Sequence, residues 1–260
     1  MIFTAVFWIT VLLWLIFCRI CYLHFYRMRK SYLVSNIISP FANFDKMKVH
    51  NKVAFILSMI HALTSLGISL YLLANYHKHE IYDSILYHIA VAVSLSHYIT
   101  DMLVVGYYEV QYLYIVHHTV SIIMITIFYI NSHISPQTYP FSMVFMEITN
   151  PFQIIFSYLI NTKQTKQKRF FVVSTIFTFM FTFVRTLVIP FIYLDLFNSI
   201  YNEVKITGFQ AIICEICGVT GVLGGLLWNY GLLKGYYNKV YLPIMTSLTS
   251  PYEEIEKKYD

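Results

Sequence analysis

Charged residues are scarce in this chain. Of its 260 residues, 12% are Asp, Glu, Lys or Arg and 58% are hydrophobic, whereas an average soluble domain carries about 25% charged residues. No polar segment is long enough to form a separate soluble domain. No basic patch exists outside the segments that flank apolar runs, which argues against nucleic-acid binding. These absences predict an integral membrane protein.

Apolar runs of about 20 residues can cross a bilayer as helices. The chain has seven such runs, at residues 2–24, 52–75, 84–106, 111–130, 139–161, 169–195 and 207–233. The predicted fold class is therefore all-α, a polytopic membrane protein with seven transmembrane helices. The first run lacks a preceding basic segment and a small-residue cleavage site, so residues 1–24 are interpreted as an uncleaved N-terminal anchor.

Lysine and arginine are distributed unequally between the two sides of the predicted bundle. The loop 25–51, the loop after the fifth span and the tail 236–260 are basic, whereas the opposite loops hold only Lys78 and Lys205. Cytoplasmic loops are enriched in these residues, so the C-terminus is predicted to be cytosolic. Phe41 and Phe44 suit a short interfacial helix in the loop 25–51.

The chain ends with a lysine pair at the third and fourth positions from its terminus, Lys257 and Lys258. This spacing, on a tail predicted to be cytosolic, is that of the dilysine retrieval signal of the endoplasmic reticulum. Such a signal is recognised by a receptor and anchors nothing. It predicts a multi-pass protein of the endoplasmic reticulum membrane and a coat receptor as a partner. A merely solvated tail is the alternative.

Cysteine is also scarce, with four residues in two CxxC pairs, Cys18/Cys21 and Cys214/Cys217. At 1.5 Å of rise per residue, the pairs lie more than about 10 Å apart along the membrane normal, so one zinc site cannot hold both. They are interpreted as apolar helix residues, and no metal or bound cofactor is expected. Four glycines on the last span, Gly218, Gly221, Gly224 and Gly225, predict close helix packing.

Four ionisable residues stand out inside the third and fourth spans: His97, Asp101, His117 and His118. Ionisable groups in a membrane are costly unless they face a cavity or each other, so they indicate a functional site. Helical rise places all four about 8–14 Å from the cytosolic end, on spans joined by a very short loop. A carboxylate beside an imidazole suits a general base or nucleophile. A purely structural polar network is the alternative.

A second polar layer is expected deeper in the membrane. Glu147 and Arg185 lie about 20 and 24 Å from the cytosolic ends of their spans, and Glu215 reaches a similar depth in the last span. Because buried ions need partners, Arg185 is predicted to pair with Glu147 or Glu215, mainly as an architectural feature. A contact with a lipid headgroup is the alternative.

Around these residues the sequence resembles the TLC-domain family, which includes ceramide synthases, translocating-chain-associating membrane proteins and smaller TLC-domain proteins. The double histidine that follows a His-to-Asp segment after a short loop is the most specific feature. Ser94 and Tyr98 complete the pattern around Asp101. The segments that carry the resemblance are LSHYITDMLV (95–104), YIVHHTVSI (114–122), FMEITNPFQ (145–153), FTFVRTLVIP (181–190) and LLWNYGLLKG (226–235).

The resemblance implies a TLC domain at residues 52–235, whose six helices form a barrel around a lipid cavity open to the cytosol. It also implies acyl transfer from acyl-CoA to a long-chain lipid or sphingoid base, with His117 and His118 as base or acyl acceptor and Asp101 in support. In the fifth span, however, Glu147-Ile148-Thr149-Asn150-Pro151 replaces the synthases' His-Asp-x-x-Asp segment and resembles the smaller TLC proteins, several of which affect membrane lipid composition.

Three further classes remain open at this point. The chain could be a non-catalytic lipid-binding or lipid-sensing protein whose histidines hold the fold together. A seven-helix receptor shares the span count, but the cysteine pair between lumenal loops, the Asp-Arg-Tyr motif and a lysine in the last span are missing. A transporter also suits polar residues at the membrane midplane.

Overall fold

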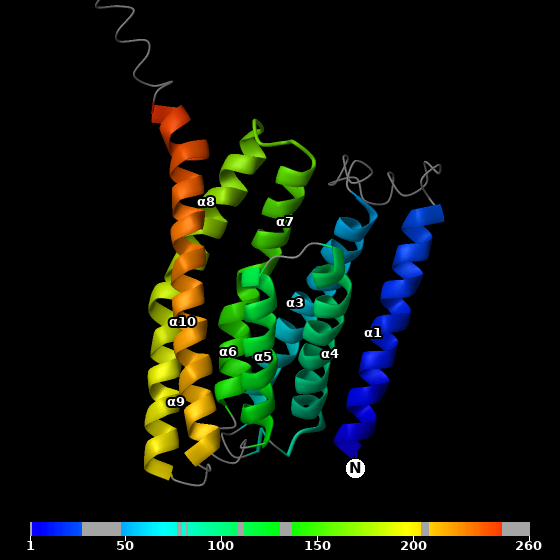
Figure 1. Ribbon diagram of the computed structural model, residues 1–260, viewed down its shortest axis with the longest axis vertical. Coiled ribbons are helices and arrows are strands. Elements are labelled where there is room, and N and C mark those ends of the chain that lie inside the picture. The colour runs from blue at the N-terminus through cyan, green and yellow to red at the C-terminus, as the bar shows by residue number, and fades with distance from the viewer. Residues whose placement is uncertain are drawn as a thin grey trace, which may run out of the picture.

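The computed structural model describes residues 2–27, 48–76, 80–81, 83–108, 112–130, 137–203 and 208–245. All regular structure in these residues is helical, and the helices lie side by side along one common direction (Figure 1). The elements are α1 (Ile2–Arg27), α3 (Val49–Asn75), α4 (Ile85–Tyr108), α5 (Tyr112–Ile130), α6 (Thr138–Ile148), α7 (Asn150–Asn161), α8 (Lys168–Phe183), the π-helix η4 (Val184–Val188), α9 (Ile189–Glu203), α10 (Gly208–Tyr236) and the π-helix η5 (Tyr237–Tyr241).

Each of the seven predicted spans coincides with a helix or with consecutive helices. Four stretches are long and apolar enough to cross a membrane: Asn51–Asn75, Thr138–Asn161, Lys168–Asp195 and Gly208–Met245. Shorter apolar stretches lie in α1 (Trp8–Cys21) and α5 (Ile115–Ile127). Long apolar helices of this kind make the chain a membrane protein. The predicted interfacial helix around Phe41 and the lysine pair at the end of the tail lie outside the described residues.

The predicted fifth span is interrupted at its middle. α6 ends at Ile148 and α7 begins at Asn150, with Pro151 in the first turn of α7. Proline has no N–H to donate and its ring clashes with the carbonyl four residues earlier, so the helix breaks here. The hydroxyl of Thr149 donates to the carbonyl of Met146 at 3.0 Å. The predicted span 139–161 is therefore made of two helices, which together form one candidate membrane span, Thr138–Asn161.

The predicted sixth span also departs from a regular α-helix. Between α8 and α9 the chain forms the π-helix η4, which contains Arg185 and closes with the N–H of Ile189 bonded to the carbonyl of Val184. Pro190 follows directly, and its missing N–H explains why the regular pattern gives way at this level. π-Helical turns insert an extra residue and occur frequently at functional sites.

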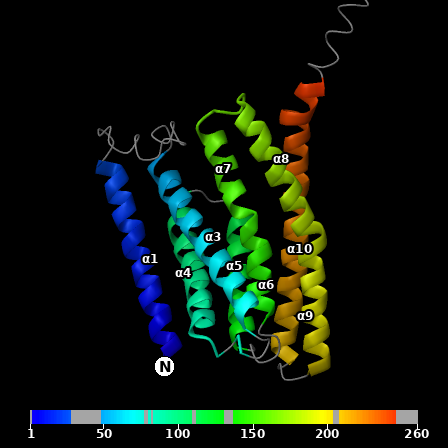
Figure 2. The same ribbon diagram turned by 180° about the vertical axis from the view of Figure 1, so that it is seen from behind.

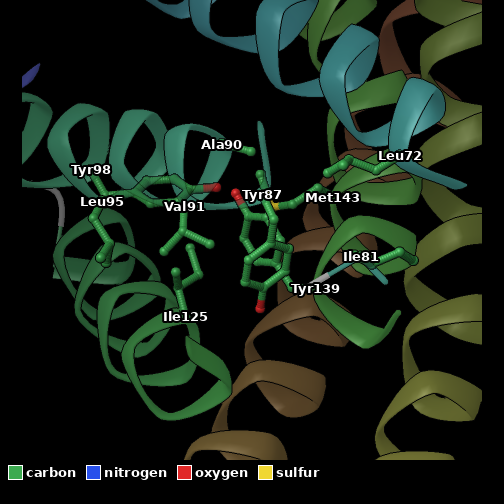
Figure 3. Packing of buried hydrophobic residues seen from close by; sticks show 10 residues of the cluster. All are labelled: Leu72, Ile81, Tyr87, Ala90, Val91, Leu95, Tyr98, Ile125, Tyr139 and Met143. Atoms are coloured by element: carbon green, nitrogen blue, oxygen red, sulfur yellow. The ribbon is translucent and has the colours of Figure 1, made fainter. Parts of the chain in front are cut away.

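Apolar packing joins α3, α4, α5 and α6 near the end of the bundle where α3 finishes and α4 begins. Figure 3 shows Ile125 of α5 pointing toward Val91 of α4, and the ring of Tyr87 beside that of Tyr139. The two tyrosine rings meet edge to face, with centroids 5.6 Å apart, a favourable aromatic geometry. This cluster closes one end of the bundle beneath the polar residues described below.

The N-terminal helix α1 packs along α4 and α3 at one edge of the bundle (Figure 1). Trp14 and Cys21 of α1 are buried, in a cluster that includes Val53 and Leu57 of α3. Trp8 of the same helix is 63% exposed, so α1 has one packed face and one outward face. Cys214 and Cys217 lie in a different cluster with Met124.

The glycine face of α10 packs against α9, as the sequence predicts. A Cβ atom at Gly218 would lie 2.8 Å from Cζ of Phe197, and one at Gly221 would lie 3.0 Å from the hydroxyl of Tyr193. Both distances are too short for larger side chains without movement. Gly224 has no such neighbour, so the close approach involves only part of the predicted face.

Viewed from behind, α3 runs across the bundle in front of α4, α5 and α6 (Figure 2). At one end of the bundle α3 and α8 begin and α7 ends, and we call this the basic end, because exposed lysines gather there: Lys48, Lys163, Lys166 and Lys168. The positive-inside pattern predicts that the basic end is cytosolic.

Candidate functional site: a polar cavity between the helices

A cavity of about 340 Å³ lies between the helices, lined by side chains from α3, α4, α5, α6, α7, η4 and α10. Asn51 and Asn161, at the first turn of α3 and the last residue of α7, line it near the basic end. Arg185 and Trp228 line it as well. Most of the residues that line it carry a polar or ionisable group, and its volume is near the lower limit for ligand pockets.

All four residues predicted for the upper polar layer line this cavity. The closest pair joins neighbouring helices: Nε2 of His118 on α5 lies 3.1 Å from Oδ2 of Asp101 on α4, and both side chains are buried. A carboxylate facing Nε2 favours the tautomer that carries its proton there, which leaves the lone pair on Nδ1. Asp101 therefore orients the imidazole and supports positive charge on it.

A second pair of an acid and an imidazole lines the same cavity. Nδ1 of His61, on α3, lies 3.7 Å from Oε2 of Glu147, on α6. The His61 ring stacks on that of His97, with centroids 3.9 Å apart and planes at 9°. Trp14 of α1 lies 5.9 Å from the other partner of this stack, His97. His97 thus contacts the N-terminal helix as well as the cavity.

Tyr98 stands between the two pairs. Its ring meets those of His61 and His118 edge to face, at 5.6 and 5.2 Å. Its hydroxyl donates to Oε1 of Glu147 at 3.5 Å, a long hydrogen bond. One aromatic ring therefore connects both imidazoles to the deeper carboxylate.

Ser94 is the centre of a buried hydrogen-bond network between α3, α4 and α6. Its hydroxyl lies 3.0 Å from that of Tyr139, 3.4 Å from that of Ser65 and 3.4 Å from Nε2 of His61. Buried polar groups are costly unless they find such partners. This network holds His61 in place and links α3, α4 and α6, which is a structural role for these polar residues.

His117 differs from His118 in its surroundings. Its ring meets His118 and Trp228 edge to face, with centroids 5.4 and 5.9 Å away. Adjacent positions on a helix diverge by about 100°, yet both rings line the cavity. His118 is held by Asp101, whereas His117 lies beside Trp228.

The deeper layer is arranged differently from the predicted ion pair. Oε2 of Glu147 accepts a hydrogen bond from the amide of Asn150 at 2.8 Å. Nη1 of Arg185 instead lies 2.9 Å from Sδ of Met146. Within the described residues, Arg185 forms no ion pair with Glu147 or Glu215. The break at Thr149 gives the reason, because it turns Asn150 back onto the carboxylate that sequence analysis assigned to Arg185.

Two participants were missed by sequence analysis. His61 is fully buried inside a long apolar helix, and the reasoning that singled out His97 applies to it equally. Tyr139 closes the Ser94 network, and no sequence signal separates it from the chain's 22 other tyrosines, since the total is 23. Among the described residues, no group of three or more His, Cys, Asp or Glu is arranged to hold a metal ion.

Comparison with protein families identifies the class of protein. The TLC domain family model matches residues 53–234, which cover most of the chain, including every helix that lines the cavity. The chain belongs to the TLC-domain family, as the resemblance in the sequence predicts. Searches of curated proteins and of solved structures gave no match.

Proposed function

We propose that this protein transfers acyl groups to a membrane lipid, with His118 and Asp101 as the acid–base pair. The supporting observation is the 3.1 Å contact between these side chains inside a polar cavity. A carboxylate-oriented imidazole within reach of a bound ligand is the arrangement that general base catalysis needs. The acyl donor in this proposal is a long-chain acyl-CoA, and the acceptor is a hydroxyl or amine of a lipid.

The proposed reaction needs no group beyond these two substrates. The acceptor oxygen or nitrogen attacks the thioester carbonyl and gives its proton to His118, while Asp101 supports the imidazolium. The carbon–sulfur bond then breaks, an ester or amide remains, and the thiolate of coenzyme A takes the proton from His118. His117 lies beside His118 along α5 and lines the same cavity, where it contacts the substrate.

The test is acyl transfer by the purified full chain, with Asp101→Asn and His118→Ala as variants. General acid–base catalysis contributes about 10²- to 10⁴-fold, so each variant is expected to lose at least about 100-fold in rate. Asp195→Asn is the matched control, because Asp195 is exposed on α9 and does not line the cavity. Unchanged transfer in both cavity variants, at equal abundance, would exclude catalysis by this pair.

The Ser94 network favours a second candidate function, in which the protein binds or senses lipids without catalysis. In that case the imidazoles hold α3, α4 and α5 together, as His61 does through Ser94. The two functions can be separated by expressing the protein in cells from which other TLC-domain proteins have been removed and measuring the lipid profiles of these cells. If the protein is a sensor, the wild type and the double variant His117→Ala/His118→Ala should change these profiles to the same extent.

The location proposed for this activity is the endoplasmic reticulum membrane, with the basic end and the C-terminus in the cytosol. Acyl-CoA would then reach the cavity from the cytosol, past Asn51 and Asn161. The lysine pair at Lys257 and Lys258 supports this location through its spacing and implies a coat receptor as partner.

A further inference from the structure

Arg185 is a buried cation that the proposed acyl-transfer chemistry leaves unused. The residue is only 8% exposed, and it lines the cavity. Its Nε has no hydrogen-bond partner. Arginine side chains stay charged in proteins, so a full positive charge borders the cavity with part of its donor capacity open.

The neighbours of Arg185 hold the side chain without neutralising it. Sδ of Met146 accepts from Nη1 at 2.9 Å, and the ring of Phe181 lies 5.1 Å from the guanidinium carbon. On the side of α10, a Cβ atom at Gly225 would lie 3.5 Å from Cδ of Arg185. A thioether and an aromatic face are weak partners for a cation. The side chain is therefore positioned, while the carboxylate of Glu147 acts on its charge only from beyond ion-pair distance.

The nearest acidic side chain on the cavity wall is already engaged. The two oxygens of Glu147 face Asn150 at 2.8 Å, Tyr98 at 3.5 Å and His61 at 3.7 Å. Within the part of the chain that the structure describes, no carboxylate lies within ion-pair distance of Arg185. Leaving a charge uncompensated in a membrane interior is strongly destabilising, so the arrangement calls for an anion supplied by the ligand.

The cavity wall near Arg185 includes a further side chain that can donate a hydrogen bond. Trp228 lines the cavity there, and an indole N–H can only donate. The planar fork of a guanidinium matches the oxygens of a phosphate, which it binds through paired hydrogen bonds. A cavity of about 340 Å³ has room for such a group.

We infer that Arg185 binds the phosphate of the cavity's ligand, and that this ligand is therefore a phosphate-bearing molecule. The inference rests on the proposed function for the choice of a lipid substrate, since a phospholipid headgroup and the phosphates of a soluble coenzyme share the same chemistry. It assigns Arg185 to ligand recognition and not to the architectural ion pair expected from the sequence.

The test measures, by calorimetry, how tightly two lipid probes bind to the purified full chain in uncharged detergent. The probes are dihexanoylphosphatidylglycerol, which carries a phosphodiester, and dihexanoylglycerol, which has the same chains without it. Wild type is expected to prefer the phosphodiester by about 10- to 100-fold, the usual effect of hydrogen bonds to a charged group. Equal binding of the two probes by wild type would overturn the inference.

Substitutions at Arg185 test whether this residue causes the preference for the phosphodiester probe. Arg185→Gln is expected to abolish the preference, and Arg185→Lys to weaken phosphodiester binding by a few-fold, because lysine keeps the charge but loses the fork. Arg19→Gln is the matched control, since Arg19 is exposed on α1 and away from the cavity. Thermal unfolding checks each variant, and the lysine variant decides if the glutamine variant does not fold. Undiminished binding by either folded variant would overturn the inference.

Competition distinguishes the sources of the phosphate. Displacement of the lipid probe by inorganic phosphate or coenzyme A supports the site and assigns it to a soluble donor. If neither compound displaces the lipid probe, the site is supported and is assigned to a lipid headgroup. His118→Ala separates this inference from the proposed function. It is expected to lose acyl transfer but to keep the preference for the phosphodiester probe, so transfer and phosphate recognition can fail independently.

Discussion

At the scale of single residues, the cavity depends on which polar groups find partners. Asp101 meets His118 at 3.1 Å and Glu147 meets Asn150 at 2.8 Å. Within the described residues, Arg185 contacts a sulfur and an aromatic face, and no carboxylate lies at ion-pair distance from it. Burying ionisable groups in a membrane is costly. The fold itself provides hydrogen-bonding partners for the two acids, whereas the inferred anionic ligand would provide the partner of the cation.

Ser94 offers a test of how far the buried network stabilises the bundle. Ser94→Ala removes the partner of the Tyr139 hydroxyl at 3.0 Å. A buried polar group that loses its partner costs about 1–3 kcal/mol, and this loss of unfolding free energy is the expected result. Denaturation in mixed micelles measures it.

The same helix provides the control for this prediction. Ser96 is also buried, but its hydroxyl donates only to the carbonyl of Ala92, at 2.6 Å, within α4. Ser96→Ala should therefore leave stability nearly unchanged, because it breaks no contact between helices. Equal effects of the two substitutions would contradict a stabilising role for the Ser94 network.

At the scale of elements, two irregular helices position the cavity's deeper residues. Pro151 separates α6 from α7, and Asn150 turns back onto Glu147. Pro190 follows η4, which carries Arg185. Prolines in membrane helices are tolerated where neighbouring groups satisfy the freed backbone. Both irregular turns lie beside residues that line the cavity, so the two prolines fall where the helices shape the site.

The N-terminal helix provides a prediction about its own packing. Trp14 is buried against His97, with ring centroids 5.9 Å apart, although α1 lies outside the residues matched by the family model. Trp14→Ala is expected to lower the unfolding free energy by about 3 kcal/mol, as large-to-small core substitutions do. Reversible unfolding in micelles is the measurement.

Trp8 is the matched control because it lies on the same helix but is 63% exposed. Trp8→Ala removes the same side chain without opening a cavity, so it should change stability little. If Trp14→Ala proves equally mild, α1 is a separate anchor as the sequence analysis expects, and not a part of the bundle's packing.

At the scale of the whole molecule, the basic end predicts one orientation in the membrane. Lys166 and Asp83 are exposed at opposite ends of the bundle. In a chain whose four cysteines are replaced by alanine, Lys166→Cys should react with an impermeant maleimide once only the plasma membrane is opened. Asp83→Cys should react only after the internal membranes are opened too. The reverse pattern would invert the predicted topology.

The tail provides a second prediction at this scale. The last ten residues, fused to a reporter of the plasma membrane, should hold it in the endoplasmic reticulum through Lys257 and Lys258. The same fusion with both lysines changed to serine should reach the surface. Equal surface display of the two fusions would show that the lysine pair is only a solvated end.

The sequence by itself determined the class of protein, the helical content and the residues of the upper polar layer. Apolar length and basic flanks are local properties, and helical rise alone places Asp101 and His118 at one depth. Family resemblance rested on the same short segments. These features need no knowledge of which helices are neighbours, apart from the pair joined by the shortest loop.

Tertiary structure alone decided the partners across distant helices. The contact of His61 with Glu147 joins α3 to α6, and depth arguments cannot choose between helices at one level. Among the described residues, Arg185 lies beyond ion-pair distance of Glu147 and Glu215, and the carboxylate of Glu147 instead accepts a hydrogen bond from Asn150, beside the break before Pro151. Side-chain direction depends on helix rotation and packing, which are properties of the assembled bundle. That no described carboxylate lies at ion-pair distance from Arg185, and with it the inferred ligand, follows only from that assembly.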